Sequence, residues 1–327
     1  MFFLIGIIAT VIMLLLLPAT SFYGNRKITA LFICFYSLLY FFIIQYGLSL
    51  HSSLELPLFF GASVLILYLT VVDRYINQKM DLSEFLKVIL FIIIPILLCL
   101  LFQNDKNQIH LVDIIALALI LGTNQSRFIK VPMVYQINTI EFYGLSTTSH
   151  LLILFIFLGY KKIEIDLFFI STIDVWVQTL VVCFFCCSSA ILVGIKLEYL
   201  AFNFKKIKIK NLANLIIFNF FHIAIAEEII YRGFVYNYLR QIIGAGDWIP
   251  LALATLLFGC HHISFGGKRM FVLSSIAGFF YGLIYVLTGN LLTAVIVHTI
   301  TNIIWRLFFI IKLDLDPVVR PSLEVKN

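Results

Sequence analysis

Long apolar runs alternate with short polar segments along this chain. In the first part the runs fall near residues 2–18, 28–50, 55–72, 86–102 and 111–122, and in the second near 148–159, 167–195, 213–239, 249–263, 270–287 and 291–311. Many approach the roughly 20 residues that a helix needs to cross a bilayer. Backbone groups in hydrocarbon must be satisfied within their own segment, which favours helices. The pattern predicts an all-α, polytopic transmembrane helical bundle of about eight to eleven membrane segments.

The composition agrees with a membrane protein and excludes a water-soluble fold. Hydrophobic residues make up 62% of the 327 positions and charged residues only 12%, about half the charged share of a soluble domain. The net charge of +6 is spread over loops and forms no basic face with interleaved aromatic residues. We therefore expect the lipid bilayer as a partner and no nucleic acid, with the loop charges following the positive-inside rule.

The cysteines all lie within apolar stretches, where a disulfide framework of the secreted kind is not expected. The spacing Cys183-x-x-Cys186 resembles half of a metal site, but no second pair follows it. We interpret these residues as small apolar packing groups.

Three regions follow from the distribution of runs and polar motifs. Residues 1–140 hold N-terminal transmembrane helices of unknown role, residues 141–312 form a core that carries the unusual polar residues, and residues 313–327 form a polar tail.

The strongest departure from apolar character is Ala226-Glu227-Glu228-Ile229-Ile230-Tyr231-Arg232. A charge at the centre of a membrane helix costs about 2.5 to 3.5 kcal/mol on insertion scales, so it tends to persist only when it is paired or functional. Glu228 and Arg232 are four residues apart and can form an ion pair on one helix face. Glu227 is rotated by about 100° from Glu228 and faces another partner.

Two further motifs place imidazoles in apolar helices. In Phe258-Gly259-Cys260-His261-His262, Phe258 and His262 share a helix face and His261 points elsewhere. In His298-Thr299-Ile300-Thr301-Asn302, the first and last residues stack one turn apart and can project toward one partner.

A carboxylate, two imidazoles and an amide on three helices form a set that can hydrolyse an amide. A carboxylate in a poorly solvated site can take a proton from water, and a histidine can share that proton. A second histidine and an asparagine supply donors for the oxyanion of a tetrahedral intermediate. The same Glu, His and His could instead bind zinc. Each motif alone could also be a hydrogen bond or ion pair between helices.

These three blocks resemble the CPBP family of intramembrane peptidases, the CaaX-protease and bacteriocin-processing group that is also described as Abi proteins. The family pattern is Glu-Glu-x-x-x-Arg, then Phe-x-x-x-His, then His-x-x-x-Asn or Asp. This sequence matches it at 227–232, 258–262 and 298–302. The resemblance covers roughly 211–306, and the connecting residues Gly278, Gly282 and Thr288-Gly289-Asn290 also fit it.

The resemblance implies an intramembrane endopeptidase of the glutamic type. Glu227 would activate water with His262, His298 and Asn302 would form the oxyanion hole, and Glu228 with Arg232 would brace the site. No cofactor is then needed; the alternative is zinc held by Glu227, His262 and His298. An asparagine is a poor zinc ligand but a good oxyanion donor, which favours the metal-free reading.

The resemblance also implies a substrate and a location. We expect a membrane-embedded or lipidated peptide as the substrate, and a multi-pass integral protein of a prokaryotic cytoplasmic membrane. Two other functions compete: a non-catalytic membrane scaffold or bacteriocin immunity protein, and a transporter that uses the intramembrane charges as a proton path. All the motif residues are present, which favours the peptidase, and no paired repeats or broken-helix symmetry support a transporter.

The basic stretch Lys205 to Lys210 is predicted to be cytoplasmic, because loop charge bias and anionic lipid both favour that side. A cysteine placed in this stretch, in a variant without the native thiols, should react with an impermeant maleimide only when the cytoplasmic face is accessible. Labelling from outside alone would invert this topology.

Overall fold

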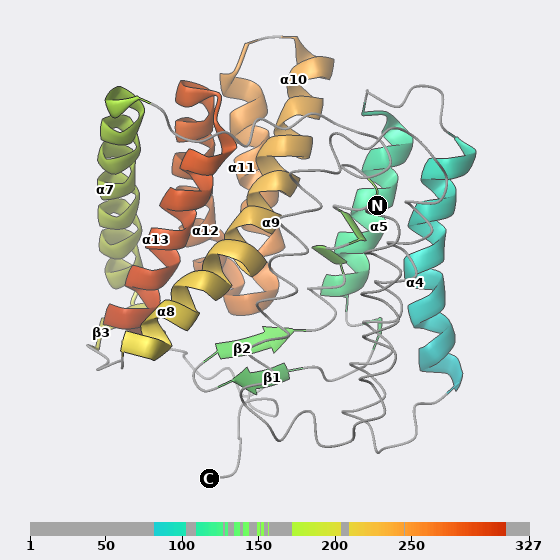
Figure 1. Ribbon diagram of the computed structural model, residues 1–327, viewed down its shortest axis with the longest axis horizontal. Coiled ribbons are helices and arrows are strands. Elements are labelled where there is room, and N and C mark those ends of the chain that lie inside the picture. The colour runs from blue at the N-terminus through green and yellow to red at the C-terminus, as the bar shows by residue number, and fades with distance from the viewer. Residues whose placement is uncertain are drawn as a thin grey trace, which may run out of the picture. The chain divides into compact units, whose positions relative to one another are not determined.

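The computed structural model describes residues 82–102, 109–126, 172–203, 209–244 and 246–311, together with short pieces between 128 and 156. The chain divides into two compact units, residues 1–165 and 166–327. Unit 1 contains helices α4 (Leu82–Leu101) and α5 (Leu111–Gln125), and the antiparallel strands β1 (Val134–Ile137) and β2 (Ile140–Tyr143). Figure 1 labels these elements and most of those of unit 2.

Unit 2 contains the membrane helices that carry the polar motifs (Figure 1). Its elements in chain order are α7 (Ile173–Lys196), β3 (Leu200–Phe202), α8 (Ile209–Phe218), η2 (Asn219–Ala224), α9 (Ile225–Glu228), η3 (Ile229–Tyr236), α10 (Asn237–Ile243), α11 (Trp248–His261), α12 (Ile263–Thr288), α13 (Leu291–Phe308) and β4 (Phe309–Ile311).

Most apolar runs that fall on described residues are helices, as predicted. The runs at 86–102 and 111–122 correspond to α4 and α5, and the five later runs from 167 onward correspond to helices of unit 2. Among the described residues, α7, α12 and α13 are long and apolar enough to cross a membrane. The runs at 2–18, 28–50 and 55–72 lie outside the described residues, and the run at 148–159 is described only in part. The total of eight to eleven segments stays a prediction.

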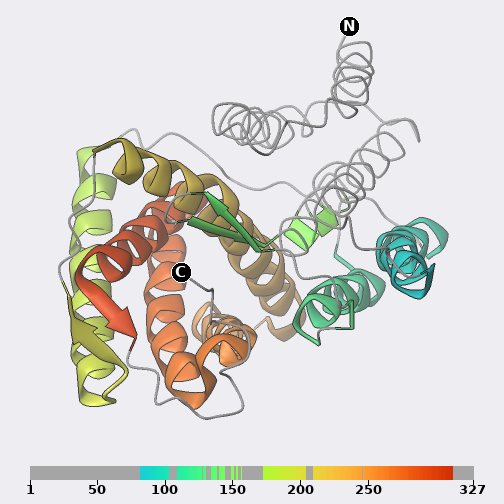
Figure 2. The ribbon, with the colours of Figure 1, turned by 90° about the horizontal axis from the view of Figure 1, so that it is seen from below.

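One run ends differently from the prediction. The run at 291–311 was expected to be helical throughout, but α13 ends at Phe308 and β4 continues as a strand. β4 pairs antiparallel with β3, with Phe202 opposite Phe309 and Leu200 opposite Ile311. Pairing satisfies the backbone groups that a helix would otherwise satisfy internally. Figure 2, seen from below, shows this pair beside the ends of α7 and α13.

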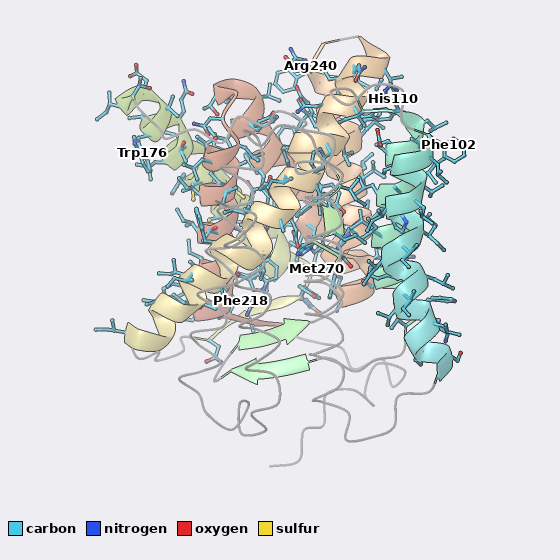
Figure 3. All side chains as sticks on the ribbon, turned by 45° about the vertical axis from the view of Figure 1, so that its right-hand side comes forward. Phe102, His110, Trp176, Phe218, Arg240 and Met270 are labelled. Atoms are coloured by element: carbon cyan, nitrogen blue, oxygen red, sulfur yellow. The ribbon has the colours of Figure 1, made fainter. Side chains whose placement is uncertain are left out.

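The order of the helices sets which residues share an end of unit 2. Short turns join α11 to α12 at His262 and α12 to α13 at Gly289-Asn290, so the three helices run alternately up and down. The α11–α12 turn lies toward the end where β3 and β4 pair, because α13 also ends there. Figure 3 shows Arg240 and Trp176 toward one end, and Met270 toward the other.

The helix from 209 to 243 is continuous but unevenly wound. Its segments η2 and η3 are π-helical and flank the short α9 that carries Glu227 and Glu228. At the end of η2 the Ile225 N–H donates to the Phe220 carbonyl five residues earlier. π-Helical turns are rare in proteins. Those that do occur are often found at functional sites.

Small residues allow close helix contacts in unit 2. A Cβ on Gly259 would lie 2.1 Å from Ser275 Oγ, and one on Gly282 would lie 2.3 Å from Leu251 Cδ1. Apolar burial alone does not drive helices together in lipid, so such close packing supplies much of the attraction. The glycines therefore fix the separation of α11 and α12.

Two consecutive glycines break α12 near its start. Gly266 and Gly267 have non-helical dihedral angles, and Gly267 has φ 61° with ψ −150°, a combination that is essentially restricted to glycine. The straight part of α12 therefore begins after Gly267, close to the predicted start at 270. The Tyr199 hydroxyl lies where a Cβ on Gly266 would be, so this turn also packs against the chain just before β3.

Replacing Gly267 with alanine should lower the free energy of unfolding by about 1–3 kcal/mol through backbone strain alone, because no heavy atom lies within 4 Å of the added Cβ. Thermal unfolding of the detergent-solubilised protein would measure the effect. Gly122→Ala, in the interior of α5 and equally free of contacts, is the matched control and should be neutral or stabilising by up to about 1 kcal/mol. Equal melting temperatures of Gly267→Ala and Gly122→Ala would contradict the proposed backbone strain at position 267.

Candidate active site

Glu227 lies at the centre of a cluster built from three helices of unit 2. Its Oε2 atom is 3.8 Å from Nε2 of His262 and 3.8 Å from Nε2 of His298. Its side chain is only 12% exposed, and Oε2 accepts no hydrogen bond from the described residues. One carboxylate oxygen therefore faces two imidazole nitrogens at equal distances.

His262 is oriented by the backbone of its own helix. It is the C-terminal cap of α11, and its Nδ1 lies 2.9 Å from the Phe258 carbonyl oxygen. A carbonyl only accepts, so Nδ1 carries the hydrogen and donates it. In the neutral ring Nε2 then has the free lone pair, and this lone pair faces Glu227. The Phe258 ring packs against the imidazole with a centroid separation of 4.6 Å.

His298 is oriented by Glu228, the neighbour of Glu227 in the sequence. Its Nδ1 is 2.7 Å from Glu228 Oε1, while Glu228 Oε2 is 2.9 Å from Arg232 Nη1. Exposure is 0% for Glu228, 1% for Arg232 and 3% for His298. A carboxylate in an ion pair with arginine accepts hydrogen bonds, so His298 donates from Nδ1. The carboxylate thus serves two partners.

Arg232 connects this network to α12. Its Nη2 donates to the Gly278 carbonyl, and its guanidinium lies over the rings of Phe258 and Tyr281, with centroid distances of 5.0 and 5.6 Å. A Cβ on Gly278 would lie 2.8 Å from Phe258 Cδ1. Glycine at 278 therefore permits the approach of the charged network to α12.

The remaining predicted residues are placed as follows. Asn302 is on α13, one turn after His298, and is partly exposed; among the described residues no hydrogen bond joins it to Glu227, His262 or His298. The His261 ring contacts the rings of Tyr231 and Phe265. Cys183 and Cys186 are free thiols buried on α7, and Cys186 Sγ contacts Thr301 Oγ1 at 3.5 Å.

Sequence reasoning missed two features of the site. The spacing of Glu228 and Arg232 predicted their ion pair, but nothing in the spacing indicated the bond from Glu228 to His298, 70 residues later. Tyr281 packs against His298 but lies in an apolar helix between two glycines, where its position carries no polar signal. The glycines Gly278 and Gly282 were the available signal for this part of α12, because glycines in a helix allow side chains of neighbouring helices to pack closely against it.

Comparison with known families supports the resemblance over the same region. Residues 209–304 match the family model described as type II CAAX prenyl endopeptidase Rce1-like. The match covers all three motifs and confirms the CPBP resemblance in this segment, which is a little under a third of the chain. No curated protein and no solved structure matches the chain.

Arg232→Ala should leave Glu228 buried without its cationic partner and lower the free energy of unfolding by about 3–5 kcal/mol. We expect poor yield and a reduced melting temperature in detergent. Arg240→Ala is the matched control, because its ion pair with Asp247 joins side chains that are 60% and 38% exposed and should contribute about 1 kcal/mol or less. Wild-type yield and stability of Arg232→Ala would show that the buried pair is dispensable.

Proposed function

We propose that this protein is an intramembrane endopeptidase that hydrolyses a peptide bond of a membrane-associated or lipidated peptide. The main support for this proposal is the position of Glu227 Oε2, which lies 3.8 Å from Nε2 of His262 and 3.8 Å from Nε2 of His298. That separation is too long for direct hydrogen bonds and suits one water molecule that bridges the three groups. Glu227 is then placed to take a proton from that water.

The attack proceeds with Glu227 as the general base. As the water oxygen bonds to the carbonyl carbon of the substrate, its proton passes to the Glu227 carboxylate, and the carbonyl electron pair moves onto oxygen. His262 holds the water through its Nε2 lone pair, since its Nδ1 is committed to Phe258. The protonated Glu227 then donates to the departing amine, which restores the carboxylate and releases both products.

His298 and Asn302 are proposed to stabilise the oxyanion. His298 donates to Glu228 from Nδ1, so it can also donate from Nε2 only when it carries a second proton. Asn302 lies one turn further along α13 and can offer its amide N–H toward the same side of the helix.

The setting and the family match support a proposal for the substrate class. The site lies among apolar helices, two of them long enough to span a membrane, and the matched family is named for CAAX prenyl endopeptidases. A prenylated peptide with a C-terminal CAAX sequence is the first candidate. Leader peptides of secreted bacteriocins, processed in a prokaryotic cytoplasmic membrane, are the second.

A zinc-dependent path through the same residues is the alternative. Glu227, His262 and His298 would hold the ion, and their donor types fit zinc. The outward Nδ1 bonds to Phe258 and Glu228 are of the kind that orient zinc ligands. Bound zinc would act as a Lewis acid on the water and the carbonyl. Donors on one tetrahedral zinc lie about 3.4 Å apart, closer than the 3.8 Å found here, and Asn302 suits an oxyanion better than a metal.

Glu227→Gln should fold normally and lose about 10²- to 10⁴-fold in turnover of a prenylated CAAX reporter peptide, because amide oxygen cannot serve as the base. Glu198→Gln, which changes an exposed carboxylate in the turn after α7, is the control and should keep wild-type turnover. Thorough chelation should leave the wild-type rate nearly intact. Cleavage products separated by mass would measure each rate.

The zinc path makes the opposite demand. Stoichiometric zinc in purified active protein, lost together with activity on chelation and regained with it, would establish the metalloprotease and overturn the metal-free proposal.

A further inference from the structure

Tyr281 is the aromatic residue of α12 that lies closest to the site without belonging to any of the three motifs. Its ring stacks on the His298 imidazole, with centroids 4.4 Å apart and planes inclined by 15°. It also meets Phe258 edge to face at 6.0 Å, and its exposure is 1%. The residue is therefore held in one orientation by its surroundings.

His298 needs a second restraint besides its hydrogen bond. The hydrogen bond from Nδ1 to Glu228 fixes one atom of the imidazole. This bond alone does not prevent the ring from tilting about the axis through Nδ1 and Glu228 Oε1. A stacked neighbour fixes the plane of the ring, and the edge contact from Phe258 at 6.0 Å and 83° limits tilting. Hydrogen bond and stack together define the direction of Nε2.

The stack also joins two helices, because Tyr281 is on α12 and His298 is on α13. The Arg232 guanidinium lies over the Tyr281 ring as well, 5.6 Å from its centroid. Gly278 and Gly282, on either side of Tyr281, let α12 approach Phe258 and Leu251 of α11.

We infer that Tyr281 is a positioning residue, which sets the ring plane of His298 and so aims its Nε2 atom at the reaction centre. The expected effect on kcat rests on the proposed peptidase function. The expected effect on the orientation of the His298 ring rests on the stack alone. The ring carries this role.

The test compares Tyr281→Leu with Tyr281→Phe. Tyr281→Leu should lower kcat for a prenylated CAAX reporter by about ten- to 100-fold, since a displacement of about 1 Å can have that effect, and should leave KM within about twofold. Tyr281→Phe keeps the stack and should recover most of the lost kcat. Tyr285→Leu removes an aromatic ring one turn along α12, where Tyr285 contacts Tyr236 and Asn237, and should keep wild-type kcat.

A second readout does not depend on peptidase activity. Diethyl pyrocarbonate should modify His298 faster in Tyr281→Leu than in the wild type, Tyr281→Phe or Tyr285→Leu, as followed by peptide mass spectrometry. If that pattern appears but the wild type cleaves neither the CAAX reporter nor a leader-peptide reporter, the proposed function fails and the positioning role stands. Wild-type kcat and unchanged modification in Tyr281→Leu, or equal losses of kcat in the Leu and Phe variants, would overturn the inference.

Discussion

The Glu228 carboxylate is the group on which the rest of the site depends. It is fully buried and contacts Arg232 through one oxygen and His298 through the other. A buried carboxylate is tolerated only when its charge is matched, so these contacts must form together when the helices assemble. The requirement brings α13 against α9 and thereby places His298 opposite Glu227.

Close helix packing makes this arrangement possible. Gly278 lets Arg232 and Phe258 approach the backbone of α12, and the π-helical segments on both sides of α9 alter the directions in which successive side chains leave the helix. His262 comes from the turn that ends α11, where a helix end leaves its side chain less enclosed than those of Glu228 and His298. The cluster therefore combines a rigid, charged side with a more open one.

Much of this site could be predicted from residue types, because charged and imidazole groups in apolar helices are costly and few. Glu227, His262 and His298 stood out for that reason, and the four-residue spacing indicated the pair of Glu228 with Arg232. The second bond of Glu228 could not be predicted, since it joins residues far apart in the sequence. Tyr281 was missed because an aromatic residue in an apolar helix has no distinguishing pattern.

In the fold, too, some features could be predicted from the local sequence and others depend on residues far apart in the chain. Apolar length identified the helices, and the glycine pair at 266–267 accounts for the predicted start of the straight part of α12 at 270. The strand β4 was not predicted, because Phe309-Ile310-Ile311 fits an apolar helix as well as a strand and its pairing depends on β3, more than 100 residues earlier. Local pattern thus predicts elements, whereas the partners that end or orient them are set by tertiary contacts.

The central claim is that the buried Glu227 cluster hydrolyses a peptide in the membrane. The most direct measurement is a comparison of membrane-associated peptides from cells that express the wild type or Glu227→Gln at equal levels. The account predicts that at least one peptide accumulates uncleaved with Glu227→Gln, while its two fragments appear only with the wild type. Identical sets of membrane peptides in the two strains, with both proteins folded and inserted, would contradict it.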